Sequence, residues 1–261
     1  MAGQLNGSVI TAFSVLNLFT PHRPIVTTQD VSRELEMNTV TAYRFLRSLE
    51  AAGAIVASQR GHYRLGLSLA DLGERAVSAD FIAAQVQPYL NALSDDLGET
   101  ALATKYSRGR VEIVARALSS RPYAMHMPVG SVLEPHCTAN GKLWLASLPP
   151  EELRRYLDNE KRASFTAQTI TDASAIIKEV EEVNRRGYAL CLREREVEIS
   201  AVAVAVKTRS GSTVAGLSIF GPSWRFSDQY VQNAVGKLKS VASEISSHLY
   251  GVTPAQNAAS R

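Results

Sequence analysis

Cysteine is scarce in this chain, and no run of apolar residues is long enough to cross a lipid bilayer. The 261 residues include two cysteines, Cys137 and Cys191, which stand in unrelated contexts without CxxC spacing. Such usage indicates a reducing compartment and argues against both a disulfide framework and a structural zinc site. The longest apolar run, residues 201–206, is far shorter than the roughly 20 residues of a transmembrane helix. We therefore expect no membrane partner.

The first residues and the overall charge exclude further classes of protein. The segment MAGQLNGSV lacks the charged and apolar regions of a secretory signal, so we expect a cytoplasmic protein. A net charge of +3 is too small for a histone-like or membrane-surface protein. Hydrophobic residues make up 45% and charged residues 20% of the chain, as in ordinary globular proteins. Any contact with nucleic acid must therefore be local.

Residues 37–67 have the pattern of a helix followed by a short hairpin. Asn38 is suited to cap the helix, because its side-chain oxygen can accept a hydrogen bond from a free amide of the first turn. Gly53 stands where a left-handed residue commonly ends a helix. Between them, apolar residues recur with helical spacing at Ala42, Phe45, Leu46 and Leu49. Strand-like pieces at 54–58 and 62–65 follow, joined by the glycine-containing residues 59–61.

This combination predicts a winged helix-turn-helix, in which the helix enters the major groove of DNA and the hairpin lies over the flanking backbone. Within residues 37–66 Glu50 is the single carboxylate against four arginines, so basic charge gathers where phosphates need neutralising. Base contacts are expected from the N-terminal end of the helix, namely Thr39, Val40, Thr41, Tyr43 and Arg44. Backbone contacts are expected from Arg47, Arg60 and Arg64. The alternative is a solvated helix beside an ordinary hairpin, with Tyr43 half-buried and Arg64 a plain surface residue.

Three helices and a hairpin complete a small domain at residues 1–67. Its first helix starts near Val9 and ends before Pro21, and Thr28 is expected to cap a second helix at 29–36. Residues 68–82 predict a linker helix, which is either a plain connector or part of a dimer interface. The dimer interface is favoured, because a single DNA-binding domain of this size would bind DNA weakly.

The remaining chain mixes strands and helices, which indicates an α+β domain at residues 83–251, with a disordered tail at 252–261. Helices are expected at 86–97, 139–148, 151–157, 173–186 and 228–250. Strands are expected at 99–106, 110–117, 123–127, 188–192, 199–206 and 214–220, and residues 128–135 are expected to form a loop. Thr138 and Asp172 are suited to cap helices, and Gly98 and Gly187 to end them.

Short segments along both domains form a recognisable series. In the first domain they are 7–9 (GSV) with Leu16 and Phe19, 41–46 (TAYRFL), Gly53 and 62–66 (HYRLG). In the second they are 138–142 (TANGK), 169–171 (TIT), 186–188 (RGY), 217–222 (LSIFGP), Arg225 and Phe226. In this order and spacing they resemble the IclR family of transcriptional regulators over nearly the whole chain. The resemblance implies a winged helix-turn-helix, a dimerising linker helix and a GAF/PAS-like α+β effector domain. It also implies dimers or pairs of dimers on DNA that control catabolic genes in response to small organic molecules.

Three positions depart from the pattern of this family. The glycine usual before the second-last strand is Glu198, and the proline usual near the end of that strand is Ala205. In the last strand the second small hydroxyl residue is Phe220, although the first is retained as Ser218. All three lie at or near the effector pocket that the resemblance implies, so we expect a ligand different from that of the best-known members.

The helix that starts at Thr138 predicts where an effector binds. The first free amides of a helix form an anion site, here around Thr138, Ala139, Asn140 and Gly141, where a ligand carboxylate can rest. The body of the ligand is then expected to contact Met125, Met127, Leu133, Cys191, Ala201, Ser218 and Phe220. Phe220 adds an apolar, stackable surface, which favours an aromatic or bulky acid. The alternative is that Met125, Met127 and Phe220 are ordinary core residues.

The neighbours His136 and Cys137, with Asn140, raise the question of a Cys–His nucleophile. Adjacent side chains seldom meet in the geometry such a pair needs, so Cys137 is interpreted as a buried structural thiol. The histidines show no ligand spacing. We expect no catalytic residue, metal or cofactor.

The sequence predicts a DNA-binding homodimer or dimer of dimers, more in keeping with a repressor of a catabolic operon than with an activator. Its expected partners are a double-stranded DNA operator and a small organic, aromatic acid or derivative. The rival hypothesis is a hydrolase that acts on a small acid derivative and carries an accessory winged-helix domain.

Overall fold

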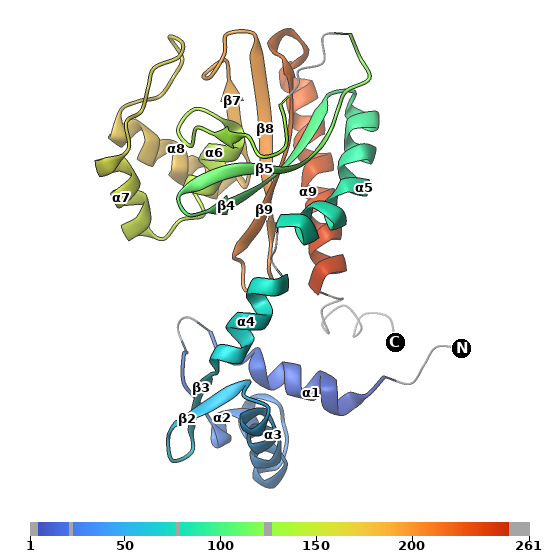
Figure 1. The fold of residues 1–261 in the computed structure, drawn as a ribbon, viewed down its shortest axis with the longest axis vertical. Coiled ribbons are helices and arrows are strands. Elements are labelled where there is room, and N and C mark those ends of the chain that lie inside the picture. Colours follow the sequence, from blue (N-terminus) through green and yellow to red (C-terminus); the bar gives the residue numbers. More distant parts are fainter. Residues whose placement is uncertain (1–4, 21–22, 77–78, 123–126, 251–261) are drawn as a thin grey trace. The chain divides into compact units, whose positions relative to one another are not determined.

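The computed structural model describes residues 5–20, 23–76, 79–122 and 127–250, and the chain divides into two compact units, Met1–Ser78 and Ala79–Arg261 (Figure 1). The expected linker at 68–82 falls on both sides of this division. Helix α4 (Leu67–Ala76) belongs to the first unit and α5 (Ala79–Leu97) opens the second. The tail expected at 252–261 lies outside the described residues. Among those described, none of the helices combines the length and apolar character that crossing a bilayer requires.

The first unit packs helices against a small antiparallel sheet. Its other helices are α1 (Gly7–Leu16), α2 (Thr28–Glu34) and α3 (Thr39–Ala51). The strands are β1 (Val26–Thr27), β2 (Ile55–Gln59) and β3 (His62–Leu65), and in the described residues they are ordered β1-β3-β2. Of the apolar stripe expected on α3, Ala42, Leu46 and Leu49 are buried and Phe45 is half-buried. They pack together with Val15, Val31, Ile55 and Tyr63. This core fixes the outward face of α3.

Capping residues set where α2 and α3 begin. Asn38 caps α3 as predicted, because its Oδ1 accepts a hydrogen bond from the Thr41 amide at 2.8 Å, and Gly53 after the helix has the left-handed φ of 72°. The prediction that Thr28 caps α2 is wrong. Thr27 caps it instead, since its hydroxyl accepts from the Asp30 amide while the Asp30 carboxylate accepts from the Thr27 amide. The Thr27 hydroxyl also donates to the Asp30 carboxylate, and this hydrogen bond, together with the one from the Thr27 amide, lowers the pKa of Asp30.

The second unit is built on an antiparallel sheet, whose described strands have the order β6-β5-β4-β9-β8-β7. They are β4 (Thr100–Ser107), β5 (Arg110–Ala117), β6 (Val132–Leu133), β7 (Ala189–Leu192), β8 (Ile199–Lys207) and β9 (Thr213–Pro222). The prediction that 128–135 is only a loop is wrong, because β6 lies there and pairs with Val111 and Glu112. Two residues are too few to give a periodic signal. The strand expected at 123–127 falls almost wholly outside the described residues.

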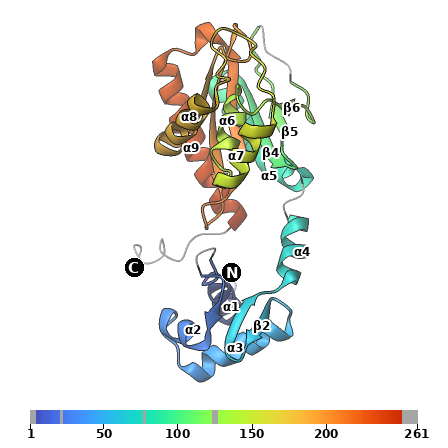
Figure 2. The same ribbon diagram turned by 90° about the vertical axis from the view of Figure 1, so that its left-hand side faces the viewer.

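Helices cover both faces of this sheet (Figures 1 and 2). Helices α5 and α9 (Asp228–Tyr250) pack on one face, and α6 (Ala139–Leu145) with α8 (Ala173–Arg186) on the other. In Figure 2, α6 and α7 (Pro150–Asn159) lie in front of the strands, and a short 3-10 turn, Ser223–Arg225, precedes α9. Side chains alternate along β8, so Ala201 and Ala203 face α6 while Val202 is buried on the opposite side.

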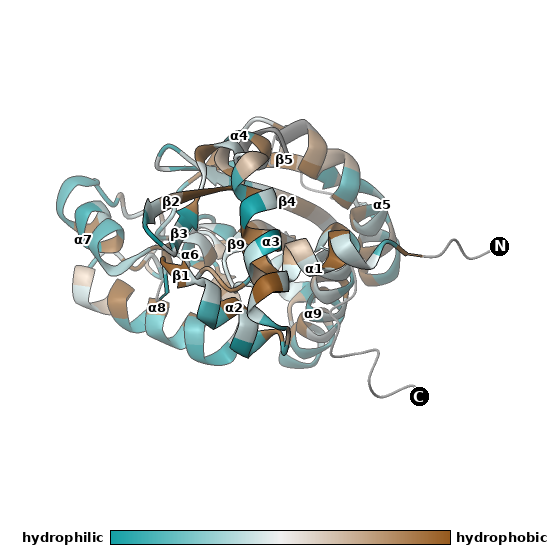
Figure 3. Ribbon diagram, turned by 90° about the horizontal axis from the view of Figure 1, so that it is seen from below, coloured by the Kyte–Doolittle hydropathy of each residue, from teal (hydrophilic) through white to brown (hydrophobic). Residues whose placement is uncertain are grey.

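Helix α8 starts and ends at the residues predicted from its capping pattern. Asp172 accepts a hydrogen bond from the Ala175 amide at 2.9 Å, and Gly187 has a φ of 74°. Its buried stripe is Ile176, Val180 and Val183, whereas its exposed side is mostly polar, teal in Figure 3, with Ile177 as an exposed apolar residue. Helix α6 also begins as predicted, with the Thr138 hydroxyl accepting from the Gly141 amide, but it ends at Leu145 rather than Leu148.

Candidate functional site

The outer face of α3 carries the polar and basic side chains expected to contact DNA. Tyr43 is 51% and Val40 71% exposed, and Thr39, Arg44 and Arg47 are also exposed. Thr41 is half-buried, and its amide is held by the Asn38 cap. A helix with two large apolar or aromatic side chains turned to solvent on its basic face has a surface suited to a partner.

The hairpin of β2 and β3 adds basic charge beside this face. Its turn consists of Arg60 and Gly61, where Gly61 has a φ of 77°, and Arg60 and Arg64 are both exposed. A hollow separates the hairpin from α3, with Tyr43 and Arg47 on one side and residues 57–61 on the other. Within the described residues, Arg47 pairs with Glu50 at 2.7 Å, whereas Arg44, Arg60 and Arg64 form no ion pair. Three cations therefore remain available to an anionic partner.

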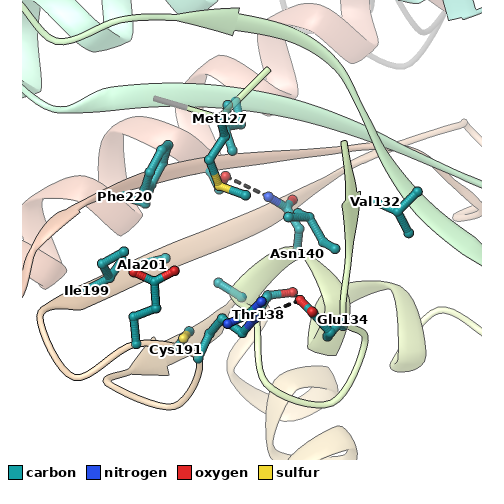
Figure 4. A pocket seen from close by; sticks show the side chains of 15 residues that line it. Met127, Val132, Glu134, Thr138, Asn140, Cys191, Ile199, Ala201 and Phe220 are labelled. Atoms are coloured by element: carbon teal, nitrogen blue, oxygen red, sulfur yellow. Dashed lines mark hydrogen bonds and ion pairs between the residues drawn. The ribbon is translucent and has the colours of Figure 1, made fainter. Parts of the chain in front are cut away.

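The second unit contains a pocket between the sheet and the start of α6 (Figure 4). It encloses, with its open mouth, about 700 Å³ not filled by atoms. The predicted residues that line it are Met127, Leu133, Thr138, Ala139, Asn140, Cys191, Ala201, Ser218 and Phe220. Met125 lies outside the described residues. Gly141 does not line the pocket. A Cβ at this position would lie 2.4 Å from the Glu134 carbonyl oxygen, so glycine is needed here for close packing of the backbone.

Six lining residues were not anticipated from the sequence: Leu102, Val132, Glu134, Arg195, Glu196 and Ile199. Leu102 faces the pocket because it pairs with Ser218 across β4 and β9, and only the register of the strands reveals this. The charged residues come from loops, where no periodicity points to a cavity. Among those charged lining residues Arg195 carries the one positive charge against the carboxylates of Glu134 and Glu196.

A buried chain of hydrogen bonds reaches the wall of the pocket. The indole nitrogen of Trp144 donates to Thr104 Oγ1 at 3.0 Å, and that hydroxyl donates to Asn140 Oδ1 at 3.0 Å. Asn140 Nδ2 then donates to Ser218 Oγ at 2.6 Å. Gly216 makes room for this chain, because a Cβ there would lie 2.6 Å from Asn140 Oδ1 and 2.7 Å from Thr104 Oγ1. All four side chains are at least 94% buried.

An ion pair lies at the other polar part of the pocket. Arg195 Nε donates to Glu134 Oε2 at 3.0 Å, and this hydrogen bond raises the pKa of Arg195 further. The guanidinium carbon also lies 4.0 Å from the centre of the Phe165 ring, which restrains the plane of the group. Both partners of the ion pair are about one-third exposed. A ligand can therefore compete with Glu134 for Arg195 without a large desolvation cost.

Helix α6 is anchored by a second, more deeply buried ion pair. Lys142 Nζ lies 2.7 Å from Glu194 Oε1 and 3.2 Å from Glu179 Oε1, and its side chain is only 4% exposed. Glu194 Oε1 also accepts from the Leu192 amide, whereas Oε2 has no partner among the described residues. Lys142 is therefore the principal compensation for a buried carboxylate.

The pair His136 and Cys137 lacks the properties of a nucleophilic site. Burial raises the pKa of the Cys137 thiol to about 12, so it is protonated at neutral pH. His136 makes its hydrogen bond to the Ala163 carbonyl, through Nε2 at 2.9 Å. The interpretation of Cys137 as a buried thiol agrees with its 0% exposure. In the described part of the chain, no three His, Cys, Asp or Glu side chains gather as metal ligands would.

Comparison with known proteins identifies the family. The model of the IclR helix-turn-helix domain matches residues 8–58, and that of the bacterial transcriptional regulator IclR C-terminal domain matches residues 74–247. The chain belongs to the IclR family. It is therefore a transcriptional regulator with a DNA-binding domain and an effector-binding domain, and not an enzyme.

Other members of the IclR family resemble the chain over most of its length. The transcriptional repressor AllR of Salmonella paratyphi A is 27% identical over 86% of this chain and 83% of its own. A putative IclR regulator structure from Silicibacter sp. TM1040 is 28% identical, with a TM-score of 0.72, and covers 95% of this chain and 98% of its own. The inducer-binding domain of a PobR double mutant from Acinetobacter, solved with 3-hydroxybenzoic acid, is 27% identical with a TM-score of 0.57. It covers 63% of this chain and 97% of its own.

Proposed function

We propose that this regulator represses a catabolic operon and that a small aromatic acid or a derivative of one releases it from its operator. The observation that carries the proposal is the pocket of the second unit, where Phe220 supplies an apolar wall and Asn140 and Ser218 supply polar groups. Pockets of this kind, mostly apolar with a few directed polar groups, are typical of small-molecule sites. The similarity to the repressor AllR supports repression rather than activation, and the 3-hydroxybenzoic acid complex of the PobR domain supports the class of ligand.

For the DNA-binding surface, α3 is placed in the major groove and the hairpin over the flanking backbone. Thr39, Val40, Tyr43 and Arg44 then reach base edges, while Arg47, Arg60 and Arg64 contact phosphates. Thr41 supports the cap at the start of the helix. A DNA-binding regulator works where the DNA is, so the cytoplasm is the compartment we infer.

A homodimer or a dimer of dimers is part of the proposal. Exposed apolar side chains on α1 and α4 support it, since Val9, Ile10 and Phe13 are 48–63% exposed and Leu72 is 54% exposed. The two DNA-binding domains of a dimer bind two half-sites. A ligand that binds one arrangement of these domains more tightly than the other changes the free energy of operator binding by the difference between its two binding free energies.

The proposal is tested by replacing Arg44 with alanine and measuring DNA binding by gel shift. The probe is a duplex that the wild-type protein selects from a random library, compared with a scrambled duplex. If Arg44 pairs with a guanine, affinity for the selected duplex should fall by about 1–3 kcal/mol, roughly 5- to 150-fold. Binding to the scrambled duplex should change far less.

The matched control is Arg60→Ala, which removes a cation from the hairpin rather than from α3. A phosphate contact carries no sequence information, so both duplexes should lose affinity equally, and the slope of log K against log salt should become shallower by about 0.9. An Arg44→Ala protein that binds the selected duplex as tightly as wild type would contradict the DNA-binding assignment of α3.

A second prediction concerns the acid group of the effector. Replacing Glu134 by glutamine removes the carboxylate that holds Arg195, so benzoates should bind about fivefold more tightly, the scale of an exposed ion pair. Isothermal titration with 3-hydroxybenzoate and the uncharged 3-hydroxybenzamide checks this, because the amide should gain nothing. Equal gains for both compounds would show that Arg195 does not bind the carboxylate.

A further inference from the structure

The hydrogen-bond chain behind the pocket has a direction that its first member sets. An indole nitrogen can only donate, so Trp144 uses one acceptor site of the Thr104 hydroxyl. That hydroxyl has a single proton, and its nearer acceptor is Asn140 Oδ1 at 3.0 Å rather than the Gly216 carbonyl at 3.4 Å. The Asn140 amide is therefore oriented with Nδ2 towards Ser218.

The last member of the chain borders the pocket. Ser218 Oγ accepts from Asn140 Nδ2 at 2.6 Å and donates to none of the described residues. Because its acceptor site facing Asn140 is occupied, the proton of the hydroxyl is left for another partner. Ser218 is 1% exposed and lines the cavity, so a molecule bound in the cavity is the available acceptor for this proton.

We propose that Trp144 and Thr104 are positioning residues that hold the Ser218 hydroxyl as a hydrogen-bond donor towards the effector. The inference rests on the proposed effector role of the pocket and adds a selection rule to it. The ligand atom against Ser218 must be an acceptor, such as a carboxylate, phenolate or carbonyl oxygen. A ligand that presents an N–H donor at the same place would leave two donors facing each other in a buried site, which is costly.

The direction of the chain can be measured without any ligand. In full-length protein with labelled asparagine amides and threonine methyl groups, the Nδ2 protons of Asn140 should show NOEs to the β-protons of Ser218. If Asn140 were flipped, the same protons would instead be close to the Thr104 methyl group. The first result supports the proposal, and the second overturns it.

The effect on binding is tested by a double-mutant cycle of Thr104→Val and Ser218→Ala, with 3-hydroxybenzoate as the probe. Each single variant should weaken binding about fivefold, the scale of one neutral hydrogen bond. In the Ser218→Ala background, Thr104→Val should cost less than twofold more, because the donor that it positions is already gone. Thr104→Ser keeps the hydroxyl and should restore wild-type affinity.

A purely structural role for Thr104 predicts a different result, namely the same loss with and without Ser218, and that outcome would overturn the proposal. If the wild-type protein does not bind 3-hydroxybenzoate at all, the aromatic-acid part of the proposed function fails. The NOE measurement then decides the direction of the chain by itself. The two failures are therefore distinguishable.

Discussion

Replacing Lys142 by methionine is expected to lower the free energy of unfolding of the second unit by about 3–5 kcal/mol. Methionine fills a similar volume but leaves Glu194, which is 6% exposed, with a buried charge. The remaining hydrogen bond, from the Leu192 amide to Oε1, serves only one of the two carboxylate oxygens. Urea unfolding of the full chain, followed by circular dichroism, measures the loss.

Two further variants separate the buried charge from other effects. In the Lys142→Met/Glu194→Gln double variant the uncompensated charge is removed, so most of the lost stability should return. Arg154→Met removes a pair with Glu151 whose side chains are 71% and 80% exposed, and it should change stability by less than about 1 kcal/mol. A Lys142→Met protein as stable as wild type would mean that Glu194 is compensated in another way.

Replacing Gly141 by alanine is expected to cost about 3 kcal/mol of unfolding free energy, the upper range for overpacking a buried site. An added Cβ would lie 2.4 Å from the Glu134 carbonyl oxygen and 2.5 Å from the Pro135 Cα. Both are backbone atoms, which cannot rotate away as a side chain does. The start of α6 must then move away from residues 134–135, and the pocket wall made by Glu134 and Thr138 moves with it.

Gly236 provides the matched control, because it is also helical, in α9, but a Cβ there meets nothing within 4 Å. Gly236→Ala should raise stability by about 0.5–1 kcal/mol through helix propensity alone. Differential scanning calorimetry and titration with 3-hydroxybenzoate together check the pair. Gly141→Ala should lose both stability and binding, and a Gly141→Ala protein with unchanged melting temperature would contradict the packing argument.

Local chemistry is why much of the fold could be predicted from the sequence. Asn38, Thr138 and Asp172 cap helices because a side-chain oxygen beside a free amide is a property of adjacent residues. Gly53 and Gly187 adopt left-handed conformations for an equally local reason. Thr27 displaced Thr28 as the cap of α2 because the carboxylate of Asp30 completes a reciprocal pair with it.

The candidate pocket was only partly predictable, because its members meet through the sheet register. Asn140 and Ser218 were anticipated from their motifs, but Thr104 joins them only because β4 pairs with β9. Arg195 and Glu134 are separated by 61 residues in the chain, and nothing in either segment indicates the other. Strand β6 was not predicted, because its two residues form a strand only through their pairing with β5.

The strand β9 carries three residues of different purpose along one face, at positions 216, 218 and 220. Because Gly216 has no side chain, Thr104 and Asn140 can meet beside it, and any side chain at this position would break the hydrogen-bond chain. Phe220 borders the cavity and belongs to the buried hydrophobic cluster that also contains Trp144, but its side chain forms no hydrogen bond in that chain. Under the proposed effector role, these two positions, four residues apart on one strand, have different expected effects. Exchanging residue 220 changes the apolar wall that a ligand meets, whereas replacing Gly216 disrupts the hydrogen-bond chain behind that wall.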